Sequence, residues 1–241
     1  MKIAVFGGVG RLSKEFVLNA ISSSHQISWF LQPNDEPTLT DNPHLKLIRG
    51  HTNDLAKYRE TIKGTSSVFV SFDPLHVDPK QFVYQQKMII LAMKQESVNR
   101  LVLVTAHGSG VSKHQLDWTT WARINLNQIK YLYNGVGSNS SYLCWSVLAQ
   151  YTAQEQVVVN GRIPQDIIGT ASDESSDLNW TIIRPGFLTD DEPTGTYLAS
   201  DQHVFGGFIS CADVVDCAIK ALEDDMDIGK QFSIAYSSRV S

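Results

Sequence analysis

The chain has 241 residues, of which 42% are hydrophobic and 19% charged, and its formal net charge at pH 7 is −5. This composition is typical of a globular protein with a sizeable core, and mild acidity without a basic stripe argues against nucleic acid as a main partner. No apolar run approaches the roughly 20 residues of a membrane span, so we expect no membrane-embedded segment.

The first residues, Met1 to Gly7, have the charge and apolarity of a signal-peptide start. A double glycine follows almost at once and no cleavage-like site comes after it, so a first β-strand is the better interpretation. The cysteines are odd in number and lack C-x-x-C spacing, which fits reduced thiols in a cytoplasmic protein. They are Cys144, Cys211 and Cys217.

Short β-rich runs alternate with helical patterns in the first part of the chain. Strands are predicted at 3–6, 27–31, 45–48, 68–72 and 101–104, and helices at 11–21, 54–62 and 81–95. Strands that alternate with helices of this length predict βαβ units and a parallel sheet. With right-handed crossovers, we predict the Rossmann strand order 3-2-1-4-5.

The second part of the chain is harder to interpret because a tryptophan- and tyrosine-rich region is broken by a Gly/Ser/Asn run at 134–141. A helix capped by Ser141 is expected to reach Val159, and a second one is expected at 163–171. A strand returns at 180–183. Farther on, Ser210 and Asp213 have the spacing of a capping box, for a helix that reaches Leu222. The last strand is predicted at 232–235.

These elements predict one domain over residues 1–241. Its fold class is α/β, a Rossmann-type doubly wound parallel sheet with a small C-terminal substrate or lid region. Residues 108–177 and 185–210 are expected to form insertions on the substrate side of the sheet.

A glycine-rich turn, GGVGRLS at 7–13, follows the first predicted strand and precedes the first helix. A pyrophosphate must approach backbone N–H groups at a helix N-terminus, so glycine is needed where side chains would block it. Gly7, Gly10, Arg11 and Leu12 are therefore candidate cofactor-binding residues. Ser13 stands where a third glycine is usual, and it is small enough to be tolerated. The alternative is a tight turn that binds no ligand.

The end of the second strand normally distinguishes NAD from NADP, because an acid there binds the ribose 2′-hydroxyl and an arginine accommodates a 2′-phosphate. Here Gln32, a candidate cofactor contact, is neutral, and Asp35 comes a few residues late. Arg11 could offer its guanidinium to a phosphate. The sequence therefore leaves NAD and NADP both open as the cofactor.

Three segments resemble atypical short-chain dehydrogenases/reductases, a group that includes NmrA-like proteins and flavin, biliverdin and quinone reductases. They are the glycine turn, LNWTIIRPGFLTD at 178–190 and ISCADVVDCAIKALED at 209–224. The resemblance implies that Pro185, Gly186 and Phe187 line the site beside the nicotinamide. Read from the residues alone, Pro185 and Gly186 simply end a strand, and Arg184 is a structural ion-pair partner.

Many such reductases use Tyr-x-x-x-Lys, in which the tyrosine donates a proton and the lysine holds the ribose. Counting back from Arg184 puts that motif near Arg162 and Asp166, and neither residue fits. Tyr151 is followed four residues later by Glu155 rather than lysine. The usual proton donor is missing, which does not exclude reductase activity, since atypical members often lack the motif.

Other candidates come from the ends of strands four and five, which face the cofactor in a Rossmann sheet. Thr105 and His107 are the catalytic candidates, because an imidazole can donate a proton near neutral pH. Phe72 is a candidate cofactor contact, and Asp73 beside it would repel a pyrophosphate unless it turns outward. The histidines show no metal-ligand spacing, so no metal is expected.

Together these features predict an NAD(P)-dependent oxidoreductase that passes a hydride to a small aromatic, quinone-like or flavin-like acceptor. The alternative is a non-catalytic, NmrA-like protein that senses NAD(P) and signals through a partner, which the altered residues Gln32, His51 and Asp73 favour. A third hypothesis is a degenerate Rossmann domain with an interaction role only. The aromatic region 118–151 could form a substrate pocket or a homodimer face, although core packing is the commoner explanation.

Overall fold

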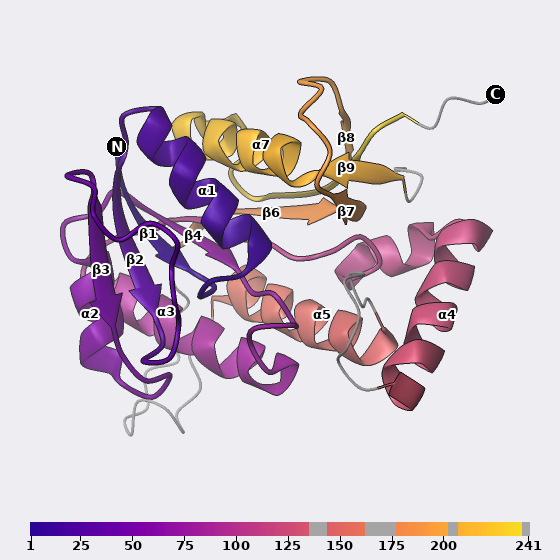
Figure 1. The fold of residues 1–241 in the computed structure, drawn as a ribbon, viewed down its shortest axis with the longest axis horizontal. Helices are drawn as coiled ribbons and strands as arrows, with labels where there is room; N and C mark the ends of the chain where they lie inside the picture. Colours follow the sequence, from indigo (N-terminus) through magenta and orange to yellow (C-terminus); the bar gives the residue numbers. More distant parts are fainter. Residues whose placement is uncertain (135–143, 162–176, 202–206, 238–241) are drawn as a thin grey trace.

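The computed structural model describes residues 1–134, 144–161, 177–201 and 207–237, and a central eight-stranded sheet runs through them (Figure 1). Its strands are β1 Lys2–Phe6, β2 Gln26–Leu31, β3 Leu45–Arg49, β4 Ser67–Ser71, β5 Arg100–Val104, β6 Asn179–Pro185, β8 Leu198–Ser200 and β10 Lys230–Ala235. Their spatial order is β3-β2-β1-β4-β5-β6-β10-β8. Neighbours pair in parallel except β8, which is antiparallel to β10. A small parallel pair stands apart, formed by β7 Phe187–Thr189 and β9 Phe208–Ser210.

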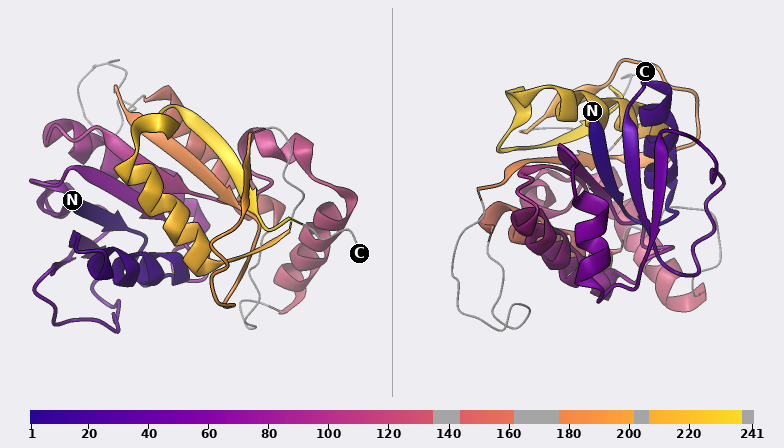
Figure 2. Two further views of the ribbon diagram at one scale, coloured as in Figure 1. Left: turned by 90° about the horizontal axis from the view of Figure 1, so that it is seen from above. Right: turned by 90° about the vertical axis from the view of Figure 1, so that its left-hand side faces the viewer.

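Helices cover both faces of this sheet (Figures 1 and 2). On one face α1 Arg11–Ser22 and α7 Cys211–Glu223 lie side by side. The other face carries α2 Leu55–Ile62, α3 Phe82–Gln95 and α5 Trp145–Asn160. α4 Trp118–Asn134 packs against α5 and extends past the sheet. Short 3-10 helices lie at η1 Pro79–Gln81, η2 Gly110–Gln115 and η3 Asp225–Asp227.

The alternation of side chains along β1 divides the core into two apolar clusters, one on each face of the sheet. Ala4 and Phe6 pack on the side of α2 and α3, whereas Ile3 and Val5 pack on the side of α1 and α7. This is the period of two that a strand buried on both faces requires. Because β1 is held from both sides, the glycine turn that follows it starts from a fixed point.

The predicted Rossmann-type sheet and its order 3-2-1-4-5 are confirmed, and β6, β10 and β8 extend it beyond β5. The predicted cap at Ser210 is also present, since its side chain accepts a hydrogen bond from the Asp213 backbone N–H. Asp54 caps α2 and Asp78 caps η1 in the same way. The acid of the Ser210 capping box does not reach back to the cap. Instead, the Asp213 carboxylate binds the loop around Thr194.

The middle of the chain differs from the prediction. α5 follows Cys144 as its N-cap residue and begins at Trp145, later than the predicted Ser141. Ser141 and the predicted helix at 163–171 lie outside the described residues. The pattern does not predict α4, because Trp118 and Trp121 on this helix point to solvent and obscure its apolar face. In the described part of the chain, no helix combines the length and apolarity that crossing a bilayer would require.

Candidate active site

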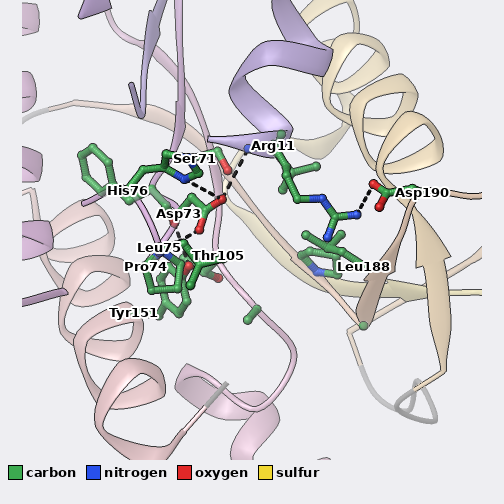
Figure 3. Close-up of a pocket in the computed structure, with 15 residues that line it drawn as sticks. Arg11, Ser71, Asp73, Pro74, Leu75, His76, Thr105, Tyr151, Leu188 and Asp190 are labelled. Carbon is green, nitrogen blue, oxygen red and sulfur yellow. Dashed lines mark hydrogen bonds and ion pairs between the residues drawn. The ribbon is translucent and has the colours of Figure 1, made fainter. Parts of the chain in front are cut away.

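A cavity of about 420 Å³ lies where β4, β5 and β6 end, beside the N-terminus of α1 (Figure 3). This is the β1/β4 position where the strand order reverses, which is where open α/β sheets bind ligands. The predicted residues that line it are Arg11, Leu12, Phe72, Thr105, Pro185 and Gly186. Lining residues that were not predicted as contacts include Ser71, Asp73, His76, Tyr151, Leu188 and Asp190.

The glycine turn has a backbone that only glycine accommodates. Gly7 has φ +135°, and a Cβ there would overlap the carbonyl oxygen of Ser71 in the neighbouring strand β4. Gly8 has φ +60°, and its carbonyl accepts a hydrogen bond of 3.1 Å from the Trp29 indole. Ser13, at the position of the third glycine, is fully buried and donates to the Ser71 carbonyl at 3.2 Å. A serine is therefore tolerated there, as predicted, because it ties α1 to β4.

The N-terminus of α1 fits a phosphate group in its backbone but holds a carboxylate from its own chain. Gly10 is the N-cap residue and provides no side-chain cap, and the first turn of α1 has no acidic residue. Asp73, from the loop after β4, fills this position: Oδ2 lies 3.4 Å from the Arg11 backbone N–H, and Oδ1 accepts from the Leu75 N–H at 2.9 Å. His76 completes the contact, with Nδ1 3.3 Å from Oδ2 of Asp73. The carboxylate thus turns inward, toward the pyrophosphate position.

Arg11 spans the mouth of the cavity. Its guanidinium forms an ion pair with Asp190, just after β7, while the rest of its side chain lines the cavity (Figure 3). The Asp190 side chain is 88% exposed, so water screens this pair and it contributes little to stability. Arg11 therefore links α1 to the β7 loop, and a competing anion could draw it away.

The end of β2 places an acid where the adenosine ribose would lie. A tight turn brings Asp35 back, so that its Oδ2 accepts from the Gln32 backbone N–H at 2.8 Å. The same oxygen would lie 3.0 Å from a Cβ on Gly8, which puts the carboxylate beside the glycine turn. Arg49, at the end of β3, holds this turn through hydrogen bonds to its carbonyl oxygens. Gln32 thus contributes its backbone here, and Asp35 contributes the charge.

A buried polar network lies directly behind the cavity. The Glu155 carboxylate receives two hydrogen bonds from Arg184, at 3.0 and 2.7 Å, and one from the Thr105 hydroxyl at 2.6 Å. Arg184 is 2% exposed and is the structural ion-pair partner that the sequence predicted. One turn before Glu155, the Tyr151 hydroxyl donates to the Phe72 carbonyl at 2.7 Å. Burial, and then the nearby Asp73 charge, raise the pKa of Tyr151, so its phenol stays neutral.

His107 is not among the residues that line the cavity. Its side chain is 3% exposed, and its Nδ1 lies 2.9 Å from the Ser233 hydroxyl of β10. Burial lowers its pKa to about 4; the nearby Arg184 charge also lowers the pKa, and Asp117 opposes the shift. The imidazole is therefore neutral near pH 7, and its catalytic role stays a prediction without a contact that supports it.

The loop after β6 closes the far side of the cavity. Pro185 and Gly186 line it, and a Cβ on Gly186 would overlap the carbonyl oxygen of Gly207. Phe187 points elsewhere: its ring packs against Phe208 and under the Arg123 guanidinium of α4. In the described part of the chain, no cluster of three or more histidine, cysteine or acidic side chains could hold a metal ion.

A family model described as NAD(P)H-binding matches residues 7–225, which cover the glycine turn, the cavity and α7. The chain belongs to this family. This match confirms the predicted NAD(P)-binding family, and the cofactor of that family is a nicotinamide dinucleotide. No curated protein sequence matches the chain.

Several solved structures share the fold of this NAD(P)H-binding protein at low sequence identity. The oxidoreductase ylbE from Lactococcus lactis has 16% identity and a TM-score of 0.69, over 98% of this chain and 91% of that one. ChuY, an anaerobillin reductase from Escherichia coli O157:H7, has 15% identity and a TM-score of 0.66, over 99% and 98% of the two chains. A short-chain dehydrogenase/reductase from Veillonella parvula in complex with NADP has 15% identity and a TM-score of 0.63, over 98% and 95%.

Two residues near the candidate site do not follow from the sequence motifs. Tyr151 lacks the lysine of the usual motif, yet it lines the cavity from α5. Asp35 comes a few residues after the predicted strand, although Pro33 and Asn34 before it are turn-forming residues that predict a chain reversal. The signals were thus a tyrosine and an acid at helical spacing, and a turn after the second strand.

Proposed function

We propose that this protein transfers a hydride from a reduced nicotinamide cofactor to a small aromatic acceptor of the quinone or flavin type. The observation that carries the proposal is an apolar cavity beside the glycine turn whose Thr105 and Tyr151 hydroxyls already donate to protein acceptors. A carbonyl substrate needs a proton on its developing alkoxide, and neither hydroxyl is free to supply it. A quinone or flavin delocalises the negative charge that it gains and needs little help.

In this proposal the chain's residues bind the cofactor, orient the acceptor and exclude water. The backbone N–H groups of α1 hold the dinucleotide phosphates, and Leu12 and Leu188 supply apolar walls for a flat ring. The bound cofactor supplies the hydride. Arg184 and Glu155 hold Thr105 in one rotamer, so the floor of the cavity stays fixed. Pro185 and Gly186 close the side opposite the phosphate turn.

We further propose that the cofactor is NAD rather than NADP. Asp35 places a carboxylate beside Gly8, where it can accept a hydrogen bond from the ribose 2′-hydroxyl and would repel a 2′-phosphate. Arg11, the other candidate for that distinction, is already paired with Asp190 across the cavity.

The test is turnover of NADH and NADPH with two panels of acceptors, one of quinones and flavins and one of unactivated ketones and aldehydes. We expect the first panel to be reduced and the second to remain unchanged. Tyr151→Phe should retain kcat with a quinone to within about threefold, because its proton goes to the Phe72 carbonyl. A loss of about 100-fold or more would instead identify the phenol as the proton donor and overturn the acceptor class.

The alternative is an NmrA-like protein that binds NAD(P) and signals without turnover. Two observations favour it: the Thr105 and Tyr151 hydroxyls already donate to protein acceptors, and His107 lies outside the cavity. Stoichiometric binding of NADH by calorimetry, with no reduction of either panel of acceptors, would select this alternative.

A further inference from the structure

The N-terminus of α1 already holds an anion, and that anion comes from the protein itself. Asp73 accepts from the Arg11 and Leu75 backbone N–H groups at 3.4 and 2.9 Å, in the manner of a helix-capping carboxylate. Its side chain also covers the glycine at the approach point, because a Cβ on Gly10 would lie 2.7 Å from the Asp73 Cβ. A pyrophosphate on this turn would need the Arg11 N–H and the space above Gly10 that Asp73 occupies.

We propose that Asp73 is a built-in competitor for the dinucleotide's pyrophosphate, and that it lowers nucleotide affinity until its carboxylate turns away from α1. This inference rests on the proposed function, because it assumes that the glycine turn binds NAD(P). It assigns to Asp73 a regulatory effect that is opposite to that of a binding residue.

The charges around Asp73 show why its carboxylate still competes with a pyrophosphate. From α1, Arg11 faces the cavity, but its guanidinium is engaged with Asp190. From α5, Tyr151 presents a neutral phenol, because burial and the Asp73 charge both raise its pKa. From the loop of Asp73 itself, His76 lies 3.3 Å away. Among the described residues that line the cavity, His76 is thus the one whose side chain pairs with the Asp73 carboxylate.

The sign of the Asp73 effect follows from this arrangement. A bound pyrophosphate would bring negative charge to the position of the Asp73 carboxylate, so the two groups repel each other. Removing the charge of Asp73 should raise the affinity, because the competing carboxylate is gone.

The experiment is calorimetric titration of NADH and NADPH into the 241-residue protein. The variants are Asp73→Asn and Asp73→Ser, and the matched control is Asp191→Asn, which removes the same charge from an exposed neighbour of the site. We expect Asp73→Asn to bind both nucleotides about tenfold more tightly than the unaltered protein, since both carry the pyrophosphate, and we expect the same of Asp73→Ser. The affinity of the control should stay within about twofold.

Two outcomes overturn the inference. Unchanged or weaker binding by both Asp73 variants, with binding intact in the unaltered protein, shows that Asp73 is neutral or a nucleotide ligand, and the proposed function survives. If neither nucleotide binds to any variant, the proposed function fails and the inference fails with it. Binding by the Asp73 variants alone would support both.

Discussion

The carboxylate of Asp35 lies beside the glycine turn, where we propose that it accepts a hydrogen bond from the cofactor's ribose 2′-hydroxyl. Its Oδ2 accepts from the Gln32 N–H at 2.8 Å, so the side chain is fixed beside the glycine turn before any ligand arrives. Asp35→Asn should weaken the binding of NADH and strengthen the binding of NADPH. The ratio of the two Kd values should shift by about tenfold, because one charge next to a phosphate is removed. Titration calorimetry measures both constants. Glu36→Gln, an exposed neighbour with the same charge change, is the control, and an equal shift in both variants would contradict the assignment.

Asp35 also illustrates which residues of the candidate site could be predicted from the sequence and which could not. Gly7 and Gly10 were predictable, because their spacing between a strand and a helix requires a bare backbone. The role of Asp35 was not, because it depends on a turn that reverses the chain within a few residues. Tyr151 depends on which helix faces the cavity, and no local pattern contains that information.

At the scale of elements, the loop between β7 and β8 is anchored by one buried carboxylate on α7. Asp213 accepts from the Thr194 and Gly195 backbone N–H groups at 2.9 and 3.0 Å, and from the Tyr236 hydroxyl at 2.6 Å. Burial alone would raise its pKa, but these hydrogen bonds lower the pKa overall. The carboxylate therefore remains ionised and holds α7, the loop and the C-terminal segment together.

Asp213→Ala should lower the free energy of unfolding by about 2–3 kcal/mol, because it leaves several donors without their acceptor. Urea denaturation measures this as a lower midpoint with an unchanged slope. Lys220→Ala, on the same helix, removes an exposed ion pair with Asp216 and should cost less than about 1 kcal/mol. Equal losses in the two variants would show that the Asp213 contacts do not anchor the loop.

Helices with a regular apolar period could be predicted from the sequence, whereas the lengths of the segments that connect elements could not. α1, α3 and α7 each bury one apolar face, and their expected limits lie within a residue or two of those observed. The tyrosine motif was sought near Arg162 by counting back from Arg184, whereas the tyrosine that lines the cavity lies on a helix that ends at Asn160. The count failed because a connection's length leaves no periodic trace in the sequence.

For the whole molecule, His107 joins three neighbouring strands at the edge where the cavity opens. It follows β5, its backbone N–H donates to the Pro185 carbonyl of β6 at 2.8 Å, and its ring contacts Ser233 of β10. Its Nε2 is buried without a hydrogen-bond partner in the part of the chain that is described. Charging this ring would place an uncompensated cation inside the sheet, so its protonation should report on global stability.

The sign and size of this effect follow from the pKa of His107, which burial lowers to about 4 in the folded protein. In the unfolded chain a histidine titrates near pH 6.5, so between about pH 6.5 and 4 the unfolded state binds the extra proton. Stability is therefore fully present above that window and is lost as the pH falls through it. From pH 7.5 to pH 5 the loss due to this one ring should be about 2 kcal/mol.

The measurement is urea denaturation at several pH values for the unaltered protein and for His107→Asn, which can still hydrogen-bond Ser233 but does not titrate. The free energy of unfolding of the variant should fall less steeply below pH 6.5, so that the two curves converge toward acid pH. Parallel curves would show that the ring is not buried as described. The same variant tests the catalytic candidate: turnover within about threefold of the unaltered protein would exclude a general acid, whose loss typically costs about 100-fold or more.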